Sequence, residues 1–234
     1  MSTFLAEFVG TMLLVFLGDG VCAATNLNKS KAQNGGWIVI ATGWALAVAI
    51  PAWIFGEASG AHFNPALTIA LAAIGNFPWA SVPSYIIAQM LGGILGAVLV
   101  WLIYLPHWEA TEDQRTKLGV FCTAPAIRNT GANLLSEILG TFMLVFGILG
   151  LGMAQMADGL GTFTVGLLIF SIGLSLGGPT GYAINPARDL SPRIAHAILP
   201  IAGKGDSDWG YAWIPVIGPI IGGLIGAFVF TWIF

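Results

Sequence analysis

Long apolar runs constrain this chain more than any other feature. A helix needs about 20 residues to cross the hydrocarbon of a bilayer. Six stretches approach that length: Phe4–Ala24, Trp37–Phe55, Pro83–Leu105, Asn133–Met156, Thr162–Gly178 and Tyr211–Phe234. The fifth run is short, and we expect its helix to extend by a turn at each end. The runs therefore predict six membrane-spanning helices.

Composition agrees with lipid as the main solvent. The chain has 234 residues, of which 56% are hydrophobic and 8% charged, and its mean hydropathy is +0.85. A soluble domain carries about 25% charged residues. The net charge is −3 and the Lys and Arg residues are scattered, which argues against a nucleic-acid-binding face. Cys22 and Cys122 have no metal-binding spacing and are expected to be free thiols.

The chain also repeats itself. FLAEFVGTMLLVF at 4–16 matches LLSEILGTFMLVF at 134–146, so Glu137 follows Glu7 by 130 residues. Each half holds an odd number of spanning runs, so the second half must be inverted relative to the first. We predict one domain over 1–234, with a first repeat at 1–105, a connecting loop at 106–131 and an inverted repeat at 132–234. Such repeats place the functional site near the midplane.

Each half contains the tripeptide Asn-Pro-Ala followed by an apolar piece too short to span. These pieces are Pro65–Ile74 and Pro186–Ile198. Asn is a favoured N-cap, and Pro suits the first helical position. We predict two re-entrant half-helices that enter from opposite faces and meet at their Asn ends. The motif residues are Asn64, Pro65, Ala66, Asn185, Pro186 and Ala187.

The segments before the half-helices are predicted to line a pore. Non-helical backbone at membrane depth must be buried in protein or must face a watery cavity. Two ladders of carbonyl acceptors follow from this rule, and the Asn amides and positive helix ends lie where they meet. Cations and protons are repelled there, whereas neutral hydroxylated solutes can exchange water for carbonyls. The ladder residues are Gly60, Ala61, His62, Phe63, Gly181, Tyr182, Ala183 and Ile184.

With these features the chain resembles the aquaporin, or major intrinsic protein, family over nearly its whole length. The paired Asn-Pro-Ala, the doubled Glu-x-x-Gly-Thr at Glu7 and Glu137, and the inverted repeat carry the resemblance. Asp189, directly after Arg188, is typical of the glycerol facilitator branch. The resemblance implies an all-α fold of six spanning helices and two half-helices. It also implies a passive channel for glycerol, water and small uncharged solutes, without enzyme activity, cofactor or metal.

The same resemblance implies a homotetramer in the plasma membrane, and we expect a bacterial inner membrane. It places a selectivity filter at Trp44, Gly173, Tyr182 and Arg188. Trp44 and Tyr182 are expected to form an apolar corner, Arg188 to donate to solute hydroxyls, and Gly173 to supply width. Relatives usually have Phe at position 182, so the tyrosine hydroxyl predicts a more polar filter.

Other functions remain open at this level. Glu7 and Glu137 are intramembrane carboxylates and so functional candidates. The resemblance makes them loop supports, but a proton relay in a coupled secondary transporter is the alternative. A channel tuned to urea, dihydroxyacetone or protonated lactic acid is another. His62 is expected to position its loop. A hydrolase G-x-S-x-G fits 173–177, but the motif needs a strand, a turn and a helix.

Charge distribution conflicts with the orientation that the resemblance implies. The positive-inside rule places Lys- and Arg-rich connections in the cytoplasm, whereas the resemblance places these connections outside. We follow the resemblance, because it matches the whole repeat. The Lys and Arg residues in these connections are Lys29, Lys31, Arg115, Lys117, Arg128, Arg193 and Lys204.

Overall fold

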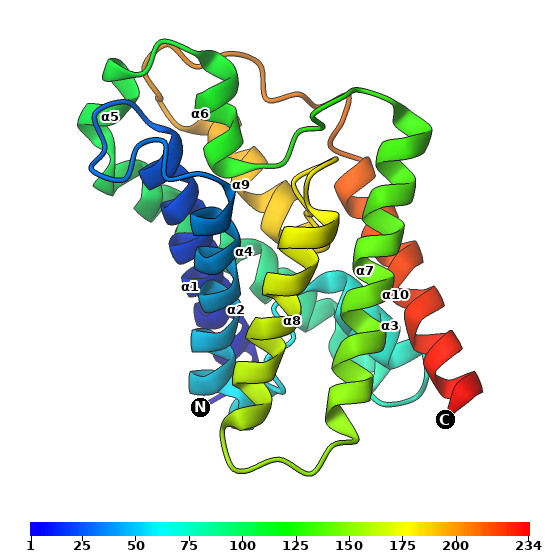
Figure 1. Ribbon diagram of the computed structural model, residues 1–234. Helices are drawn as coiled ribbons and strands as arrows, with labels where there is room; N and C mark the ends of the chain where they lie inside the picture. Colours follow the sequence, from blue (N-terminus) through cyan, green and yellow to red (C-terminus); the bar gives the residue numbers. More distant parts are fainter.

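The computed structural model describes residues 1–234 and contains helices and connecting segments only (Figure 1). Five helices are long and apolar enough to span a membrane: α1 (Thr3–Asn26), α2 (Trp37–Ser59), α4 (Val82–Ile103), α7 (Thr130–Gly152) and α10 (Ile214–Ile233). A sixth, α8 (Leu160–Leu176), is shorter. The half-helices are α3 (Pro65–Ala73) and α9 (Pro186–Ile198). The predicted all-α fold class is confirmed.

The helix boundaries differ from the predicted ones where glycine or turn geometry intervenes. α8 does not gain a turn at each end: it has 17 residues, because Gly159 precedes it at φ 79° and Pro179 follows it closely. α2 continues to Ser59, where Gly60 ends it in the left-handed conformation at φ 81°. α7 ends at Gly152, ahead of the predicted Met156.

The connecting segment at 106–131 is not a plain loop. It contains most of α5 (Leu105–Ala110) and all of α6 (Gln114–Phe121). Asp113 caps α6, because its side chain accepts a hydrogen bond of 2.8 Å from the Thr116 amide. A turn replaces the predicted start of α10, which begins at Ile214 and not at Tyr211. Hydropathy alone did not reveal these polar, locally capped elements.

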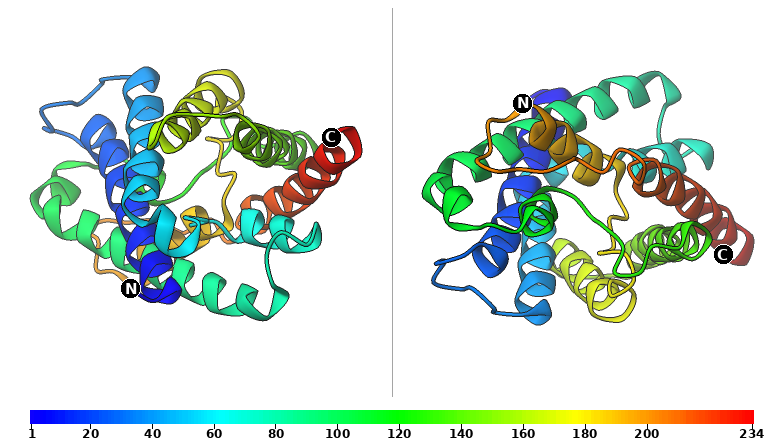
Figure 2. Two further views of the ribbon diagram at one scale, coloured as in Figure 1. Left: turned by 90° about the horizontal axis from the view of Figure 1, so that it is seen from below. Right: turned by 90° about the horizontal axis from the view of Figure 1, so that it is seen from above.

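The two halves of the chain pack in matching ways. α1 packs on α4 and α2, and α7 packs on α10 and α8. The half-helices cross over, since α3 packs mainly on α10 and α9 mainly on α4. Along the long axis the spanning helices surround the non-helical segment ahead of α9 (Figure 2). Each half therefore completes the other.

Small residues allow these backbones to touch. A Cβ at Gly92 would lie 2.1 Å from the Phe8 carbonyl oxygen, and one at Gly222 would lie 2.1 Å from that of Ile138. The second pair lies 130 positions after the first. Close approach through small residues is the usual means of helix association in membranes, and here it occurs at the same place in each repeat.

Both termini lie at one end of the molecule, and α5, α6 and the cationic connections lie at the other (Figure 1). Lys117 donates to the Ala202 carbonyl. Lys204 donates to three carbonyls at the end of α9, within 2.7 Å, where a cation suits the helix dipole. Arg128 pairs with Asp208, whose hydrogen bond raises the pKa of the guanidinium. These three cations therefore secure loops at this end of the molecule.

Candidate functional site

Two re-entrant segments lead into the half-helices with unusual backbone geometry. Ala61 and Phe63 have φ of 51° and 48°, and Tyr182 and Ile184 have φ of 41° and 45°. The left-handed conformation costs about 1–2 kcal/mol for an L-residue. Positive and negative φ values alternate along each segment, so its carbonyls cannot form the hydrogen bonds of a helix. Such segments must be held by groups outside them.

Glu7 holds the first segment. Its Oε1 accepts hydrogen bonds from the Ser59 hydroxyl (2.6 Å) and the His62 amide (3.0 Å). Its Oε2 accepts from the Phe63 amide and the Gln89 side chain, both at 2.8 Å. The carboxylate is fully buried and satisfied by donors from α2, the loop and α4.

Glu137 holds the second segment in the same manner. Its oxygens accept from the Thr180 hydroxyl (2.7 Å), the Ala183 amide (3.1 Å) and the Ile184 amide (2.9 Å). Neither Glu7 nor Glu137 lines the cavity described below. Their positions favour support of the loops over proton transfer.

The two Asn side chains cross-link the segments. The Asn64 amide donates to the Ile184 carbonyl at 2.9 Å, and the Asn185 amide donates to the Phe63 carbonyl at 2.8 Å. Each half-helix is thus tied to the segment ahead of the other. The geometry brings together residues 120 and 122 positions apart.

The same side chains cap the half-helices. Asn64 Oδ1 accepts from the Ala66 amide at 2.9 Å, and Asn185 Oδ1 accepts from the amides of Ala187 (3.0 Å) and Arg188 (3.2 Å). An Asn amide has two N–H groups, and one of each goes to the opposite segment. Both residues line the cavity, where the second N–H can meet a solute.

A cavity of about 230 Å³ runs past these groups. It reaches from Trp44 and Arg188 to Gly161 and Thr162 at the start of α8. Residues of both re-entrant segments, from 60 to 64 and from 182 to 185, line it with polar backbone. The remaining wall is largely apolar and includes Leu14, Val48, Leu67, Leu144, Ile148 and Ile169.

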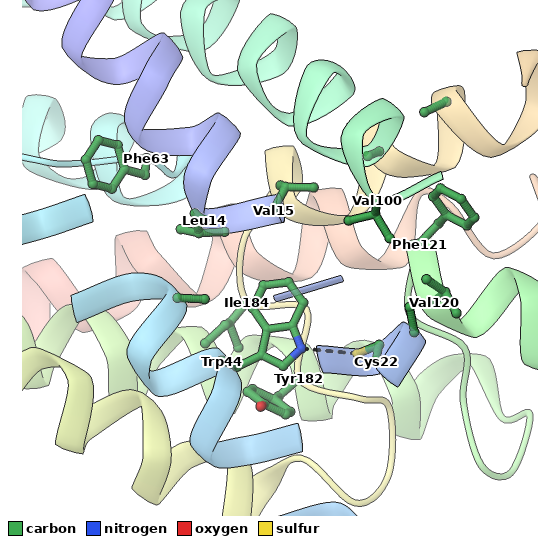
Figure 3. Close-up of a cluster of buried hydrophobic side chains, with 14 of the residues drawn as sticks. Leu14, Val15, Cys22, Trp44, Phe63, Val100, Val120, Phe121, Tyr182 and Ile184 are labelled. Carbon is green, nitrogen blue, oxygen red and sulfur yellow. Dashed lines mark hydrogen bonds between the residues drawn. The ribbon is translucent and has the colours of Figure 1, made fainter. Parts of the chain in front are cut away.

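One end of the cavity is formed by aromatic rings and a guanidinium. Cζ of Arg188 lies 3.8 Å from the Trp44 ring centroid, which is a close cation–π contact. Trp44 is held from behind by α1: its Nε1 donates to the Cys22 sulfur at 3.4 Å (Figure 3). A Cβ at Gly18 would lie 2.2 Å from the same ring, so α1 fits flat against it.

Gly173 contributes to this end without lining the cavity. A Cβ there would lie 2.9 Å from Cζ of Tyr182 and 3.0 Å from its hydroxyl oxygen. Gly173 therefore lets the ring of Tyr182 lie back against α8, and the Trp37 indole donates to the Gly173 carbonyl at 2.9 Å. The Tyr182 hydroxyl is buried and has no hydrogen-bond partner. It lies beside Gly173 of α8, and the more polar filter stays a prediction.

Asp189 lies outside the cavity and clamps two loops. Its Oδ2 accepts from the amide and hydroxyl of Thr123, both at 2.7 Å. Its Oδ1 accepts from Arg193 at 2.9 Å, and Arg193 also donates to the carbonyls of Ser207 (2.7 Å) and Asp208 (3.2 Å). Charge-assisted bonds of this kind are strong, and here they fix the loops around the start of α9.

A polar network around His62 escaped the sequence analysis. Nδ1 of His62 lies 3.1 Å from the Thr68 hydroxyl, which also accepts from Gln89 at 3.1 Å. Gln89 in turn donates to Glu7, so α3 and α4 support the first segment together. The second repeat has Pro219 where the 130-residue offset would place a counterpart of Gln89. Only the packing of α3 against α4, which brings Thr68 to Gln89 and Gln89 to Glu7, reveals the network.

The G-x-S-x-G match at 173–177 has no hydrolase geometry. Residues 173–176 belong to α8, whereas the motif requires a strand and a sharp turn ahead of the helix. The His and Asp that follow the motif in the chain are bound elsewhere. The ring of His196 lies 2.8 Å from the Ser207 hydroxyl, and the Asp189 carboxylate accepts hydrogen bonds from Thr123 and Arg193. The hydrolase interpretation is wrong.

Comparisons with known proteins agree with this geometry. Residues 1–230 match the family model described as "Major intrinsic protein". The chain is 63% identical to the probable glycerol uptake facilitator protein of Thermotoga maritima over 100% of both chains. It is 61% identical to the glycerol uptake facilitator protein of Bacillus subtilis over 94% of this chain and 80% of the relative. The aquaglyceroporin from Plasmodium falciparum superposes with a TM-score of 0.86 at 29% identity, covering 97% of this chain and 93% of that one.

Proposed function

Because the chain belongs to the major intrinsic protein family, we propose that it is a channel through which glycerol, water and other small uncharged solutes diffuse passively. The family consists of membrane channels, not enzymes, and the chain is an integral membrane protein. The two-sided cavity carries the proposal. Glycerol has hydroxyls along one edge and CH groups along the other, and the cavity offers carbonyls and amides opposite apolar side chains.

The end of the cavity at Trp44 and Arg188 is suited to orient such a solute. Arg188 offers N–H donors for hydroxyl oxygens, and the rings of Trp44 and Tyr182 can pack on the CH edge. Beyond this point the carbonyls of the re-entrant segments accept hydroxyl hydrogens, and Asn64 and Asn185 donate. A solute with hydroxyls loses few hydrogen bonds on entry, because each bond to water has a replacement.

Ions have no such replacement. The N-termini of α3 and α9 meet at the Asn pair, where their dipoles present positive potential. Arg188, beside Trp44, offers N–H donors and so provides no ligand for a cation. The apolar wall offers no ligands to replace the hydration shell of an ion. Fixed positive charge and lost hydration together are a known means of cation and proton exclusion in aquaporin-type pores.

We infer further that residues 1–234 form one channel domain of two inverted repeats, 1–105 and 132–234, and that four copies assemble with one pore each. Family membership supports the tetramer. The bacterial origin of the most similar relatives supports a bacterial cytoplasmic membrane. Native mass spectrometry in detergent tests the assembly: a single species of four chains is expected, and a stable monomer contradicts it.

The coupled-transporter alternative would need Glu7 or Glu137 to face the cavity. Glu7 and Glu137 are both fully buried and accept hydrogen bonds from loop amides. This arrangement favours the channel. A channel tuned to urea, dihydroxyacetone or protonated lactic acid uses the same cavity, so the choice among neutral solutes rests on flux.

Proteoliposome swelling in a panel of solutes tests the proposal. Glycerol is expected to enter faster than urea, dihydroxyacetone or lactic acid. Its flux should rise in proportion to concentration and should not respond to an imposed proton gradient. Vesicles without protein give the background. Saturation at moderate glycerol together with dependence on the gradient would establish a transporter, and a faster solute than glycerol would correct the substrate.

A further inference from the structure

Asp19 is a buried carboxylate that the proposed function does not use. It lies in α1 one turn before Cys22 and has no exposed surface. Neither of its oxygens has a hydrogen-bond partner. An isolated carboxylate in such surroundings is unfavourable, so its position requires a compensating group.

The compensating group is the guanidinium of Arg188, which lies beside Trp44 in the cavity wall. Nη1 of Arg188 lies 3.8 Å from Oδ1 of Asp19 and is itself buried without a hydrogen-bond partner. The other nearby carboxylate, Asp189, is already committed to Arg193 and Thr123. Asp19 is therefore the one carboxylate paired with Arg188.

Asp19 approaches Arg188 from behind the filter. The same stretch of α1 supports Trp44, through the flat contact at Gly18 and the hydrogen bond to Cys22. The guanidinium of Arg188 stacks on the Trp44 ring. Asp19 does not line the cavity, whereas Arg188 does. The pair thus presents a donor to the solute and keeps its carboxylate out of the lumen.

We propose that Asp19 is the counter-ion of Arg188 and determines specificity by cancelling the charge of the filter guanidinium. The inference rests on the proposed channel function. A lone guanidinium at a constriction attracts small anions as well as hydroxyl oxygens. Opposite charges about 4 Å apart interact strongly away from bulk water. Pairing leaves Arg188 with N–H donors for neutral solutes and little net attraction for anions.

Asp19→Asn tests this role because it removes the charge with almost no change in shape. Vesicles in potassium nitrate with valinomycin swell at a rate limited by nitrate uptake, because valinomycin carries potassium. Nitrate also has no neutral form at neutral pH. We expect the nitrate-to-glycerol permeability ratio to rise by at least about tenfold, a modest change for a charge pair at this distance.

Two further variants make the test specific. Asp19→Glu keeps the charge and should keep the wild-type ratio. Asp19→Asn combined with Arg188→Val should show no anion-dependent rise, because no uncompensated cation remains. Thermal unfolding and assembly in detergent are measured for each variant, so that altered selectivity is distinguished from misfolding.

An unchanged ratio with normal glycerol flux in Asp19→Asn would overturn the proposal, because the carboxylate would then not act through its charge. An equal loss of both fluxes would also overturn it and leave Asp19 a structural residue. If Asp19→Asn does not assemble, Asp19→Ala provides the same electrostatic test, and failure of both to assemble counts against the proposal. If the wild type carries another neutral solute faster than glycerol, that solute becomes the reference and the nitrate comparison stands.

Discussion

At the scale of single residues, the width of the proposed selectivity filter depends on Gly173 and Tyr182 together. The ring of Tyr182 occupies the space that the missing side chain of Gly173 leaves on α8. The cavity wall at this point is the ring, and the glycine acts through it. The hydroxyl of Tyr182 is buried without a hydrogen-bond partner, and Gly173 leaves room for it beside α8.

Gly173→Phe is expected to reduce glycerol flux far more than water flux. The new side chain has no room beside Tyr182 and must force that ring into the cavity. We expect the glycerol-to-water permeability ratio to fall by about tenfold or more, as differences in pocket size can produce. Stopped-flow swelling of proteoliposomes measures both rates. Tyr182→Phe is the matched control and should keep the ratio, since only the buried hydroxyl is lost.

Retained glycerol flux in well-folded Gly173→Phe would show that the Tyr182 ring does not depend on this glycine. A changed ratio in Tyr182→Phe would show that the hydroxyl reaches the lumen after all.

Asn185→Asp is expected to reduce the flux of neutral solutes by about tenfold. Asp is as good an N-cap as Asn, so α9 should still begin at the same place. The variant loses the donor to the Phe63 carbonyl and places an acceptor-only group beside it. Glycerol swelling rates report the loss, and unchanged thermal unfolding shows that the fold survives. Undiminished glycerol flux in inserted protein would argue against the two-Asn pore.

At the scale of elements, each half-helix depends on one glutamate two helices away. The re-entrant segments contain residues at positive φ, which do not hold this conformation on their own. Glu7 and Glu137 bind the amides between those residues. The two carboxylates are buried there because the amide N–H groups of the re-entrant segments need hydrogen-bond acceptors.

Glu137→Gln is expected to lower the free energy of unfolding by roughly 1.5–3 kcal/mol, the range for a hydrogen bond to a charged group. The amide NH₂ would face the Ile184 or Ala183 amide and leave it without an acceptor. Denaturant unfolding in detergent measures the change. Residual flux should remain independent of a proton gradient. A gradient-driven wild-type flux that this variant abolishes would support the relay.

At the scale of the whole molecule, glycine contacts hold each half together at corresponding places. The backbones of α1 and α4 touch at Gly92, and those of α7 and α10 touch at Gly222. The crossed packing of α3 on α10 and α9 on α4 then depends on both pairs. The cavity exists only when both halves are in place.

Gly92→Ala is expected to destabilise the protein by about 1–3 kcal/mol, the usual effect of overpacking. Its Cβ would collide with the Phe8 carbonyl at 2.1 Å. Gly20→Ala is the matched control in α1, where a Cβ would meet nothing within 4 Å. Alanine is the better helix former, so the control should be neutral or slightly stabilising. Opposite shifts in melting temperature are the expected result, and equal shifts would contradict close packing at Gly92.

The sequence by itself determined the long helices and the two half-helices, but not the short helices of the connections. Apolar runs of bilayer length, the Asn-Pro start of each half-helix and the 130-residue repeat are local or periodic signals, and lipid leaves few alternatives for them. Helix ends were less certain, as at α8, because a glycine turn or a cap outweighs hydropathy there.

Only the tertiary structure decided which side chains meet. Three contacts join residues of different elements: the pairing of Asp19 with Arg188, the packing of the Tyr182 ring on Gly173, and the hydrogen bond from Gln89 to Glu7. No spacing in the sequence predicts them, because each depends on how helices rotate about their axes when they pack. That rotation is set by the sum of close contacts between small residues, and it exists only in the folded chain.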